Sequence, residues 1–452
     1  MSDYADFINE KNGQFFWQPM TNPQDALKKK PDVIVKGEGC WIWDVNGHKT
    51  FDAVAGLWSS NLGHSNQRVR NAIVQQLDTL PFYNSFRGNT NNRAIELSSA
   101  LVEFMQPEDV HSVMFCNGGS DAVESALKLA RQYWKLQGQG DRTKFISLKQ
   151  GYHGTHFGGA SVNGNINFRR MYEPLLPGCF HVETPWLYRN AFDLDDPIAL
   201  GKQCAVMLER EIIFQGPDTI AAFIAEPVQG AGGLIVPPEN YWPLVREICD
   251  KYGILLIADE VITGFGRSGE MFGTRLWNVN ADIWCLAKGI SSGYMPLGAT
   301  AIGRKVFDVF MNDTSGRAAI GHGYTYSGHP VAAAAAIETL KILSEENIVG
   351  NAKTVGAHFN QRLQEFYKYD CVGDVRGIGL MSALELVEDK VKKTTLAKTN
   401  NLLSRIARSA YEKGLTVRTS GANMILSPPL ILTLSDADYI VDTLHSAFSD
   451  VA

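Results

Sequence analysis

Short apolar runs alternate with amphipathic helical patterns through the middle of this 452-residue chain, and no other feature restricts the fold as much. Each run is strand-sized and ends in a polar or glycine-rich segment; the runs are residues 112–116, 145–148, 220–225, 254–258 and 283–287. Residues 121–136 and 241–252 carry apolar side chains at helical spacing. This alternation predicts an α/β fold, with a mainly parallel sheet covered by helices on both faces.

The two ends of the chain have a different texture. Short antiparallel strands are expected before the central region, over residues 33–36, 40–44 and 50–52. Asn46 and Gly47 would form the hairpin turn between the last two of them. An alanine-rich helix over 331–345 leads out of the central region. We therefore predict a large domain flanked by a small α+β domain from both termini; the ranges are 61–330 for the large domain, and 1–60 and 331–452 for the small one.

Composition argues against several classes of function. A net charge of −6 with dispersed positive charges speaks against nucleic-acid and membrane-surface partners. The seven cysteines form no CxxC pair and the histidines lack metal-site spacing, so we expect reduced thiols and no metal. The first residues do not resemble a secretory signal, and no apolar stretch approaches bilayer length. These features favour a cytoplasmic protein.

Two apolar strands end in charged side chains. One closes on Asp259, and a second, over 281–287, is followed by Lys288. Ligands of open α/β sheets bind beyond the carboxyl ends of the strands. A buried ammonium group needs a partner, a covalent modification or a lowered pKa. The pair alone is equally consistent with a Schiff-base lysine and with a structural ion pair.

Two glycine-rich segments bear on ligand binding. Residues 115–121 run from a strand through two glycines and a serine into a helix, which suits a phosphate group but is common without one. Residues 264–269 match the GxGxxG pattern of dinucleotide-binding proteins. However, four residues separate that pattern from Asp259 at the strand end, and the sequence after it has poor helical periodicity. A Rossmann turn is therefore only a minor alternative.

Taken together, these segments resemble the class III (ω-amino acid) aminotransferases, which are pyridoxal-phosphate (PLP) enzymes of fold type I, over nearly the whole chain. The longest match is residues 255–289, LLIADEVITGFGRSGEMFGTRLWNVNADIWCLAKG. The other matches are NGGSDAVESALKLAR (117–131), GYHG (151–154), AEPVQG (225–230), HGYTYSGHP (322–330), VRGIGLM (375–381) and PPL (428–430). The chain departs from the family pattern at Gly118, where Ser is more usual, and at Asp121, where Glu is more usual.

The resemblance implies a PLP cofactor held by Lys288 as a Schiff base until the substrate amine displaces it. The freed lysine would then move a proton between substrate and cofactor. Asp259 would pair with the pyridine nitrogen, so that the ring accepts electrons from the substrate carbon. Other residues implied at the cofactor are Tyr152 and Val261 on the two ring faces, Gln229 at the phenolic oxygen, Glu226 in the same region, Gly119 and Ser120 at the phosphate, and Thr325 from the partner subunit of a homodimer.

The resemblance also bears on the two substrates of a ping-pong reaction through aldimine and ketimine intermediates. Relatives that use 2-oxoglutarate have a glutamate five residues after Glu226, where this chain has Ala231. The pattern is similar to that of pyruvate-dependent ω-transaminases, in which the arginine at the position of Arg418 grips the keto acid. The side chains implied to line the substrate pocket are Trp58, Phe86 and Tyr152. The donor stays open among β-alanine, taurine, diamines or polyamines and hydrophobic amines.

Several alternatives remain open. Within the family they are a PLP aminomutase, a decarboxylating relative and a 2-oxoglutarate-dependent ω-aminotransferase. Outside it they are an NAD-dependent oxidoreductase that uses the GxGxxG segment and a binding module without catalysis. The presence of both Lys288 and Asp259 speaks against the binding module.

Overall fold

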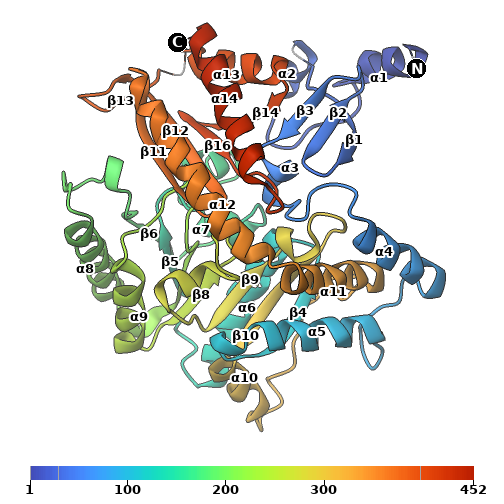
Figure 1. Cartoon of the computed structure of the whole chain (residues 1–452). Coiled ribbons are helices and arrows are strands. Elements are labelled where there is room, and N and C mark those ends of the chain that lie inside the picture. The colour runs from blue at the N-terminus through green and yellow to red at the C-terminus, as the bar shows by residue number, and fades with distance from the viewer. Residues whose placement is uncertain (1, 29, 398, 452) are drawn as a thin grey trace.

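The computed structural model describes residues 2–28, 30–397 and 399–451 and has a seven-stranded sheet at its centre (Figure 1). Its strands are β4 (Val110–Cys116), β5 (Lys144–Leu148), β6 (Cys179–Val182), β7 (Ile220–Ala225), β8 (Leu255–Asp259), β9 (Ile283–Leu286) and β10 (Gly298–Gly303). They follow the order β4-β10-β9-β8-β7-β5-β6. β10 is antiparallel to both its neighbours, whereas the pairs from β9 to β6 are parallel. The prediction of a mainly parallel, mixed sheet is confirmed.

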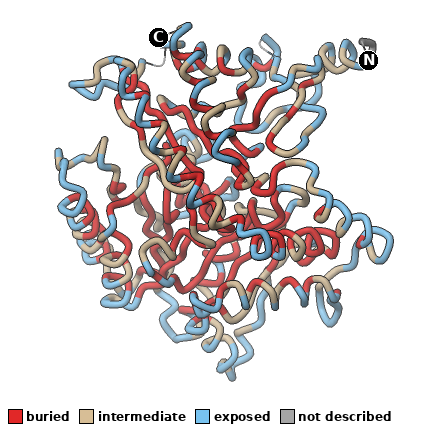
Figure 2. The backbone as a smooth tube through the Cα atoms, viewed as in Figure 1, coloured by how far each residue is buried: buried red, intermediate tan, exposed pale blue. Residues whose placement is uncertain are grey.

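Helices cover both faces of this sheet. The main ones are α5 (Asn92–Phe104), α6 (Gly119–Leu136), α8 (Pro197–Gln215) and α9 (Tyr241–Tyr252). Side chains alternate between the two faces along β8: Leu255 and Ile257 pack with α6, whereas Leu256 and Ala258 join a larger cluster with the other three helices. All four side chains are fully buried. Figure 2 shows the resulting layer of buried backbone across the middle of the molecule. A strand buried on both faces explains the continuous apolar run in its sequence.

Strands from the two ends of the chain share one sheet. Its members are β1 (Ile34–Glu38), β2 (Trp41–Asp44), β3 (Lys49–Asp52) and β14 (Leu415–Thr416), in that order. β14 pairs in parallel with β3, so a C-terminal strand completes the N-terminal hairpin. A second small sheet consists of β11 (Val372–Ile378), β12 (Met381–Asp389), β13 (Thr394–Thr395), β15 (Arg418–Ser420) and β16 (Asn423–Leu426). This arrangement confirms the small α+β unit from both termini, while the boundaries at 60 and 330 stay predictions.

The remaining helices connect or cover these sheets. They are α1 (Ser2–Lys11), α2 (Pro23–Lys28), α3 (Ala55–Trp58), α4 (Gln67–Thr79), α7 (Phe157–Val162), α10 (Arg304–Met311), α11 (Pro330–Glu345), α12 (Ile348–Leu363), α13 (Leu402–Glu412) and α14 (Leu434–Val451). The two chain ends lie in the same part of the molecule, where α13 and α14 lie near β3 (Figure 1). Across the described residues, no helix combines the length and apolar character needed to cross a bilayer.

Most predicted elements occur within two residues of their expected positions. The turn at Asn46 and Gly47 is present, with Gly47 at φ +85° and the Asp44 side chain accepting from the Asn46 amide at 2.9 Å. The structure also has elements that the sequence patterns did not predict, among them β6, β10, α4, α5, α8 and α10.

The GxGxxG segment is a bridging loop and not a dinucleotide-binding turn. Residues 264–269 form successive turns, and the next element is a short 3₁₀ helix, Gly273–Trp277. Arg267 within the loop is fully buried and donates to Leu380 O at 3.2 Å, to Pro428 O and to Asn61 Oδ1 at 2.9 Å. The loop therefore joins the central sheet to the small sheets, and the Rossmann alternative is wrong.

Candidate active site

Three charged side chains lie at the carboxyl ends of neighbouring parallel strands. Glu226 follows β7, Asp259 is the last residue of β8, and Lys288 comes two residues after the end of β9. β8 pairs in parallel with both neighbours, with Ala225 opposite Ala258. This register brings the three groups to one edge of the sheet, where ligands of open α/β sheets bind.

Asp259 is held by a buried histidine that the sequence patterns did not single out. His153 Nδ1 lies 2.8 Å from Asp259 Oδ2, and the two side chains are almost fully buried. The Val261 amide donates to the other carboxylate oxygen at 3.2 Å. The His153 amide donates to Asn163 Oδ1, which fixes the histidine backbone. The position of His153 next to Tyr152 in the GYHG segment was the signal that could have identified it.

Lys288 is partly buried and has a left-handed backbone, φ +48°, which residues other than glycine rarely adopt. Burial lowers the pKa of Lys288 to about 8; the charges of Asp259 and Glu226 oppose this effect, and that of Arg418 adds to it. A lysine of this kind has a substantial neutral fraction near pH 8, and the neutral form is the nucleophile.

Glu226 connects the strand ends to the loops around them. One of its carboxylate oxygens accepts from the Tyr152 amide at 3.0 Å and the other from the Gly230 amide at 2.9 Å. Burial raises the pKa of Glu226 to about 7, partly offset by His153. The side chain therefore fixes two backbone segments at the site and carries only a partial negative charge near neutral pH.

Tyr152 and Val261 both reach the same region from loops. The Tyr152 ring is half-buried and packs edge-on against Phe168, with 4.9 Å between ring centroids. Burial raises the pKa of Tyr152, and the charges that act on it belong to Asp259, Arg418 and Glu226. A Cβ atom built on Gly119 would lie 2.8 Å from Val261 Cγ1. Val261 thus lies directly against the first residue of α6.

The first turn of α6 has the features of an anion site. Its N-cap residue, Gly118, provides no side-chain cap, so the amides of Gly119 and Ser120 keep donor capacity. Ser120 Oγ accepts from the Thr155 amide at 3.1 Å and can still donate its own proton. The Asp121 carboxylate is already engaged: it accepts from the Asn117 amide at 2.9 Å and lies 2.6 Å from His156 Nε2.

Gln229 and Ala231 lie on the loop that follows β7. Gln229 Nε2 donates to Lys149 O at 2.9 Å, while its buried Oε1 has no partner among the described residues. A buried amide oxygen without a donor marks a place where a ligand can complete the hydrogen bonding. Ala231 O accepts from Ser420 Oγ at 3.2 Å, so this loop contacts β15.

Arg418 is the first residue of β15, which belongs to the small sheet formed with β11, β12 and β16. Burial lowers the pKa of Arg418, and Tyr152 partly opposes this effect. The charge of Arg418 in turn acts on Lys288. Trp58 is 3% exposed and packs with Val228 and Ile262, which follow β7 and β8. Their expected roles toward the substrate stay predictions.

Phe86 and Thr325 lie elsewhere in the single chain. Phe86 is 43% exposed and lines a cavity of about 750 Å³ with the 320–323 segment. Lys288, Asp259 and Glu226 are absent from its lining. Thr325 is exposed on a neighbouring turn. A single chain therefore does not place either residue beside Lys288, and their expected roles stay predictions.

Comparison with known proteins identifies the family. The family model for class III aminotransferases matches residues 25–448. A putrescine–pyruvate aminotransferase from Pseudomonas aeruginosa is 38% identical over 96% of this chain and 94% of its own length. A probable mitochondrial γ-aminobutyrate transaminase 3 from Oryza sativa is 36% identical over 97% of this chain and 86% of its own length.

Solved structures give the same result. An amine transaminase from an uncultivated Pseudomonas species, solved in its PLP-bound form, is 49% identical with a TM-score of 0.96, covering 97% of this chain and 99% of that one. An ω-transaminase from Pseudomonas jessenii in complex with PMP is 40% identical with a TM-score of 0.95, covering 98% and 97%.

The sheet order and the charged groups at its edge, together with these structures, define a PLP enzyme of fold type I. Within that class, the chain belongs to the class III aminotransferases. It has the fold of the PLP-dependent ω-transaminases, as the resemblance in its sequence implied.

Proposed function

We propose that this aminotransferase moves an amino group from an amine or ω-amino acid donor to pyruvate. The observation that carries the proposal is Arg418 on β15: a half-buried guanidinium whose charge acts on Tyr152 and Lys288, and which forms no ion pair or side-chain hydrogen bond among the described residues. Ala231, on the loop that contacts β15, offers a methyl group instead of a carboxylate. Arg418 therefore stays available to a substrate carboxylate. The putrescine–pyruvate aminotransferase among the relatives supports the same acceptor.

The residues at the sheet edge fit PLP. Lys288 offers an amine of lowered pKa for covalent attachment, and Asp259 offers a buried carboxylate for the pyridine nitrogen. The uncapped start of α6 with Gly119 and Ser120 suits the phosphate, and the unpaired Gln229 Oε1 can accept a hydrogen bond from the phenolic hydroxyl of the cofactor. When bound, PLP supplies the electron sink that makes the substrate C–H acidic.

The other side chains orient these groups. We assign Tyr152 and Val261 to the two ring faces. Lys288, once its attachment is exchanged for the substrate amine, moves the proton at the reacting carbon, because it is the basic group that follows the strand end beside Asp259. Glu226 holds the amides of Tyr152 and Gly230, which fixes the walls of the pocket. Trp58, which packs with Val228 and Ile262, forms the apolar wall of the substrate pocket.

An acceptor comparison tests the proposal directly. With one donor such as putrescine, kcat/KM for pyruvate is expected to exceed that for 2-oxoglutarate, and alanine should form in step with loss of the donor amine. Faster reaction with 2-oxoglutarate would show that 2-oxoglutarate, and not pyruvate, is the preferred acceptor. Isomerisation of the donor without alanine formation would indicate an aminomutase.

Arg418→Leu is expected to raise KM for pyruvate by about 30-fold or more, the usual consequence of losing one member of a hydrogen-bonded charge pair. KM for an apolar donor such as 1-phenylethylamine should change little, because that donor has no carboxylate. Stopped-flow measurement of the two half-reactions separates these effects. Arg408→Leu is the matched control, since Arg408 pairs with Glu412 on the surface of α13. Equal effects of both variants on pyruvate would contradict the assignment of Arg418.

Covalent capture of PLP by the apoprotein should become about tenfold faster between pH 7 and pH 9 and then level off. The rate rises with pH because only the neutral form of the amine attacks an aldehyde, and burial lowers the pKa of Lys288 to about 8. An ordinary lysine, with a pKa of about 10.4, would show a rate still rising beyond pH 10. Asp259→Asn should move the midpoint lower, because the charge of Asp259 raises the pKa of Lys288. A midpoint above pH 10 in the unaltered protein contradicts this account.

We further propose a cytoplasmic homodimer. Phe82 packs against Tyr326 with 5.5 Å between ring centroids, and both rings remain exposed near Phe86 and the cavity beside it. A second copy that covers this surface would bury these aromatic groups and could bring Thr325 to the phosphate of its neighbour. The seven cysteines all carry free thiols, which supports a reducing compartment.

A further inference from the structure

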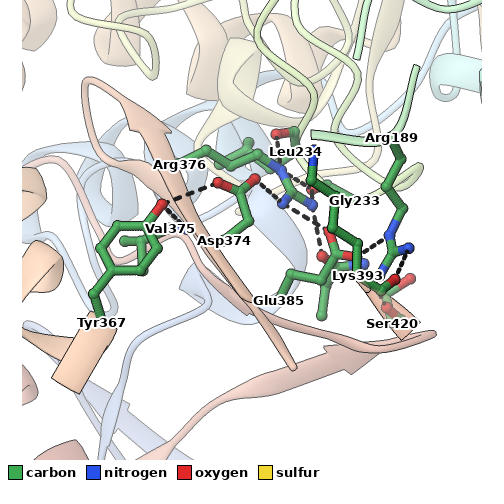
Figure 3. Close-up of polar contacts among 11 residues, drawn as sticks. Arg189, Gly233, Leu234, Tyr367, Asp374, Val375, Arg376, Glu385, Lys393 and Ser420 are labelled. Atoms are coloured by element: carbon green, nitrogen blue, oxygen red, sulfur yellow. Dashed lines mark hydrogen bonds and ion pairs between the residues drawn. The ribbon is translucent and has the colours of Figure 1, made fainter. Parts of the chain in front are cut away.

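Arg376, on β11, uses every nitrogen of its guanidinium group in hydrogen bonds (Figure 3). Nε donates to Gly233 O at 3.0 Å and to Leu234 O at 2.9 Å. Nη1 donates to Asp374 Oδ2 at 2.7 Å and to Glu385 Oε2 at 2.9 Å. Nη2 donates to Gly233 O as well and to Asn423 Oδ1 at 2.6 Å. The side chain is 11% exposed. We call this set of residues the Arg376 clamp. It joins the small sheet to the loop after β7.

The loop is shaped for this contact. Gly233 has φ +121°, and a Cβ atom there would lie 3.1 Å from Asn423 Nδ2 and 3.3 Å from Arg376 Nη2. A side chain would therefore push the loop away from the guanidinium group. Leu234 next to it is fully buried with Trp58 and has φ +56°. A left-handed leucine costs free energy, so the surrounding contacts must hold the loop in place.

The clamp closes a ring of hydrogen bonds that includes β15. Asn423 accepts from Arg376 and donates from Nδ2 to Ser420 O at 3.3 Å. Ser420 Oγ donates to Ala231 O at 3.2 Å, and Ala231 lies two residues before Gly233 on the same loop. Ser420 is the last residue of the strand that begins with Arg418. The ring therefore fixes the loop with Ala231 relative to the strand with Arg418.

Ion pairs of Arg376 with buried carboxylates make the ring of hydrogen bonds rigid. Glu385 is 2% exposed and is shared by Arg376 and Arg189, whose Nε donates to its other carboxylate oxygen. Figure 3 shows Glu385 between the two guanidinium groups. Asp374 balances the second positive charge. Removal of one member of such a buried set leaves a partner without compensation, so the set resists small displacements.

We infer that Arg376 is a positioning residue for the carboxylate of the keto acid: the Arg376 clamp sets the distance and direction of Arg418 relative to Ala231 and thereby the affinity for the acceptor. The inference rests on the proposed role of Arg418. It goes beyond that role because Arg376 itself contacts backbone and side chains of the protein and not the substrate.

Arg376→Lys tests the inference, because it keeps the charge and removes the planar fork that reaches all the acceptors. We expect KM for pyruvate to rise about tenfold, in line with the effect of small displacements at a binding site, and the half-reaction with 1-phenylethylamine to change less than about twofold. Arg275→Lys is the matched control. Arg275 likewise donates to a buried carboxylate, Glu108, at 2.6 and 3.0 Å and to Phe104 O at 2.8 Å, in a different part of the fold.

Two further measurements separate the inference from the proposed function. Hydrogen exchange of the apoprotein in segments 229–236 and 415–426 should be faster in Arg376→Lys, by roughly threefold or more, and unchanged in Arg275→Lys. In an Arg418→Leu background, Arg376→Lys should cause no further rise in KM for pyruvate.

Faster exchange without a rise in KM for pyruvate, or a rise no larger than that of Arg275→Lys, overturns the inference and leaves the proposed function standing. Equal losses for pyruvate and 1-phenylethylamine also overturn it, since they indicate a general structural role. A rise in KM for pyruvate with Arg376→Lys but none with Arg418→Leu refutes the assignment of Arg418 to the substrate carboxylate. The inference that Arg376 acts by positioning Arg418 is then refuted as well.

Discussion

Lys288→Ala is expected to slow steady-state amino transfer by more than about 10⁴-fold, because the proposed assignment gives this one side chain both the covalent attachment and the proton transfer. The structure puts Lys288 at the same edge of the sheet as Asp259 and Glu226, whose charges act on its amine, and burial lowers the pKa of Lys288 to about 8. The variant should also lose the visible absorbance of covalently bound PLP. Both changes are measured on the purified protein with PLP in excess.

The variant should remain folded, which makes the result interpretable. Alanine fits the space, and removing a partly buried ammonium group removes a desolvation cost. The left-handed backbone at position 288 is strained for alanine as it is for lysine. The Tm of the apoprotein should therefore stay within a few degrees of the unaltered protein. PLP that can still be trapped on the variant by borohydride reduction, on a different lysine and with turnover, would contradict the assignment.

Sequence patterns predicted elements well where a single segment carries its own signal. β7 and α9 have the predicted bounds, because an apolar run buried on both faces and a helical stripe are local features. β10 was missed because GATAIG has glycine, alanine and threonine in place of a continuous apolar run. Its burial comes from β4 and β9, which pair with it on either side, and neither partner is visible in its own six residues.

The same distinction applies to the site. Asp259 and Lys288 were singled out because apolar strands end at or just before them, whereas their roles came from the family resemblance; the parallel register of β8 and β9 brings the two strand ends together. His153 was missed because its role depends on contact with Asp259, 106 positions away. The Arg376 clamp depends on contacts across up to 143 positions. Long-range polar contacts of this kind leave no periodic pattern in the sequence.

Asp259→Asn is expected to slow the half-reaction with an amine donor by roughly 10³-fold, the upper range for loss of one preorganised electrostatic group. In the proposed assignment, the carboxylate would keep a proton on the pyridine nitrogen of bound PLP, and loss of its negative charge would make the cofactor a weaker electron acceptor. Asparagine has nearly the same shape, and its oxygen can still accept from His153 Nδ1, which lies 2.8 Å from Asp259 Oδ2. The change therefore removes charge while it preserves packing.

Asp282→Asn provides the matched control for this charge change. Asp282 is also buried, at 7% exposed, and accepts from the Leu256 amide at 2.8 Å, but it lies just before β9, at the opposite edge of the sheet from Asp259. Both variants lose one buried negative charge, so both should lower the Tm. Only Asp259→Asn should slow the half-reaction and enlarge the kinetic isotope effect of a donor deuterated at the carbon that bears the amine, because C–H cleavage then limits the rate. Similar rates for the two variants would show that the charge at Asp259 acts on stability and not on the transfer step.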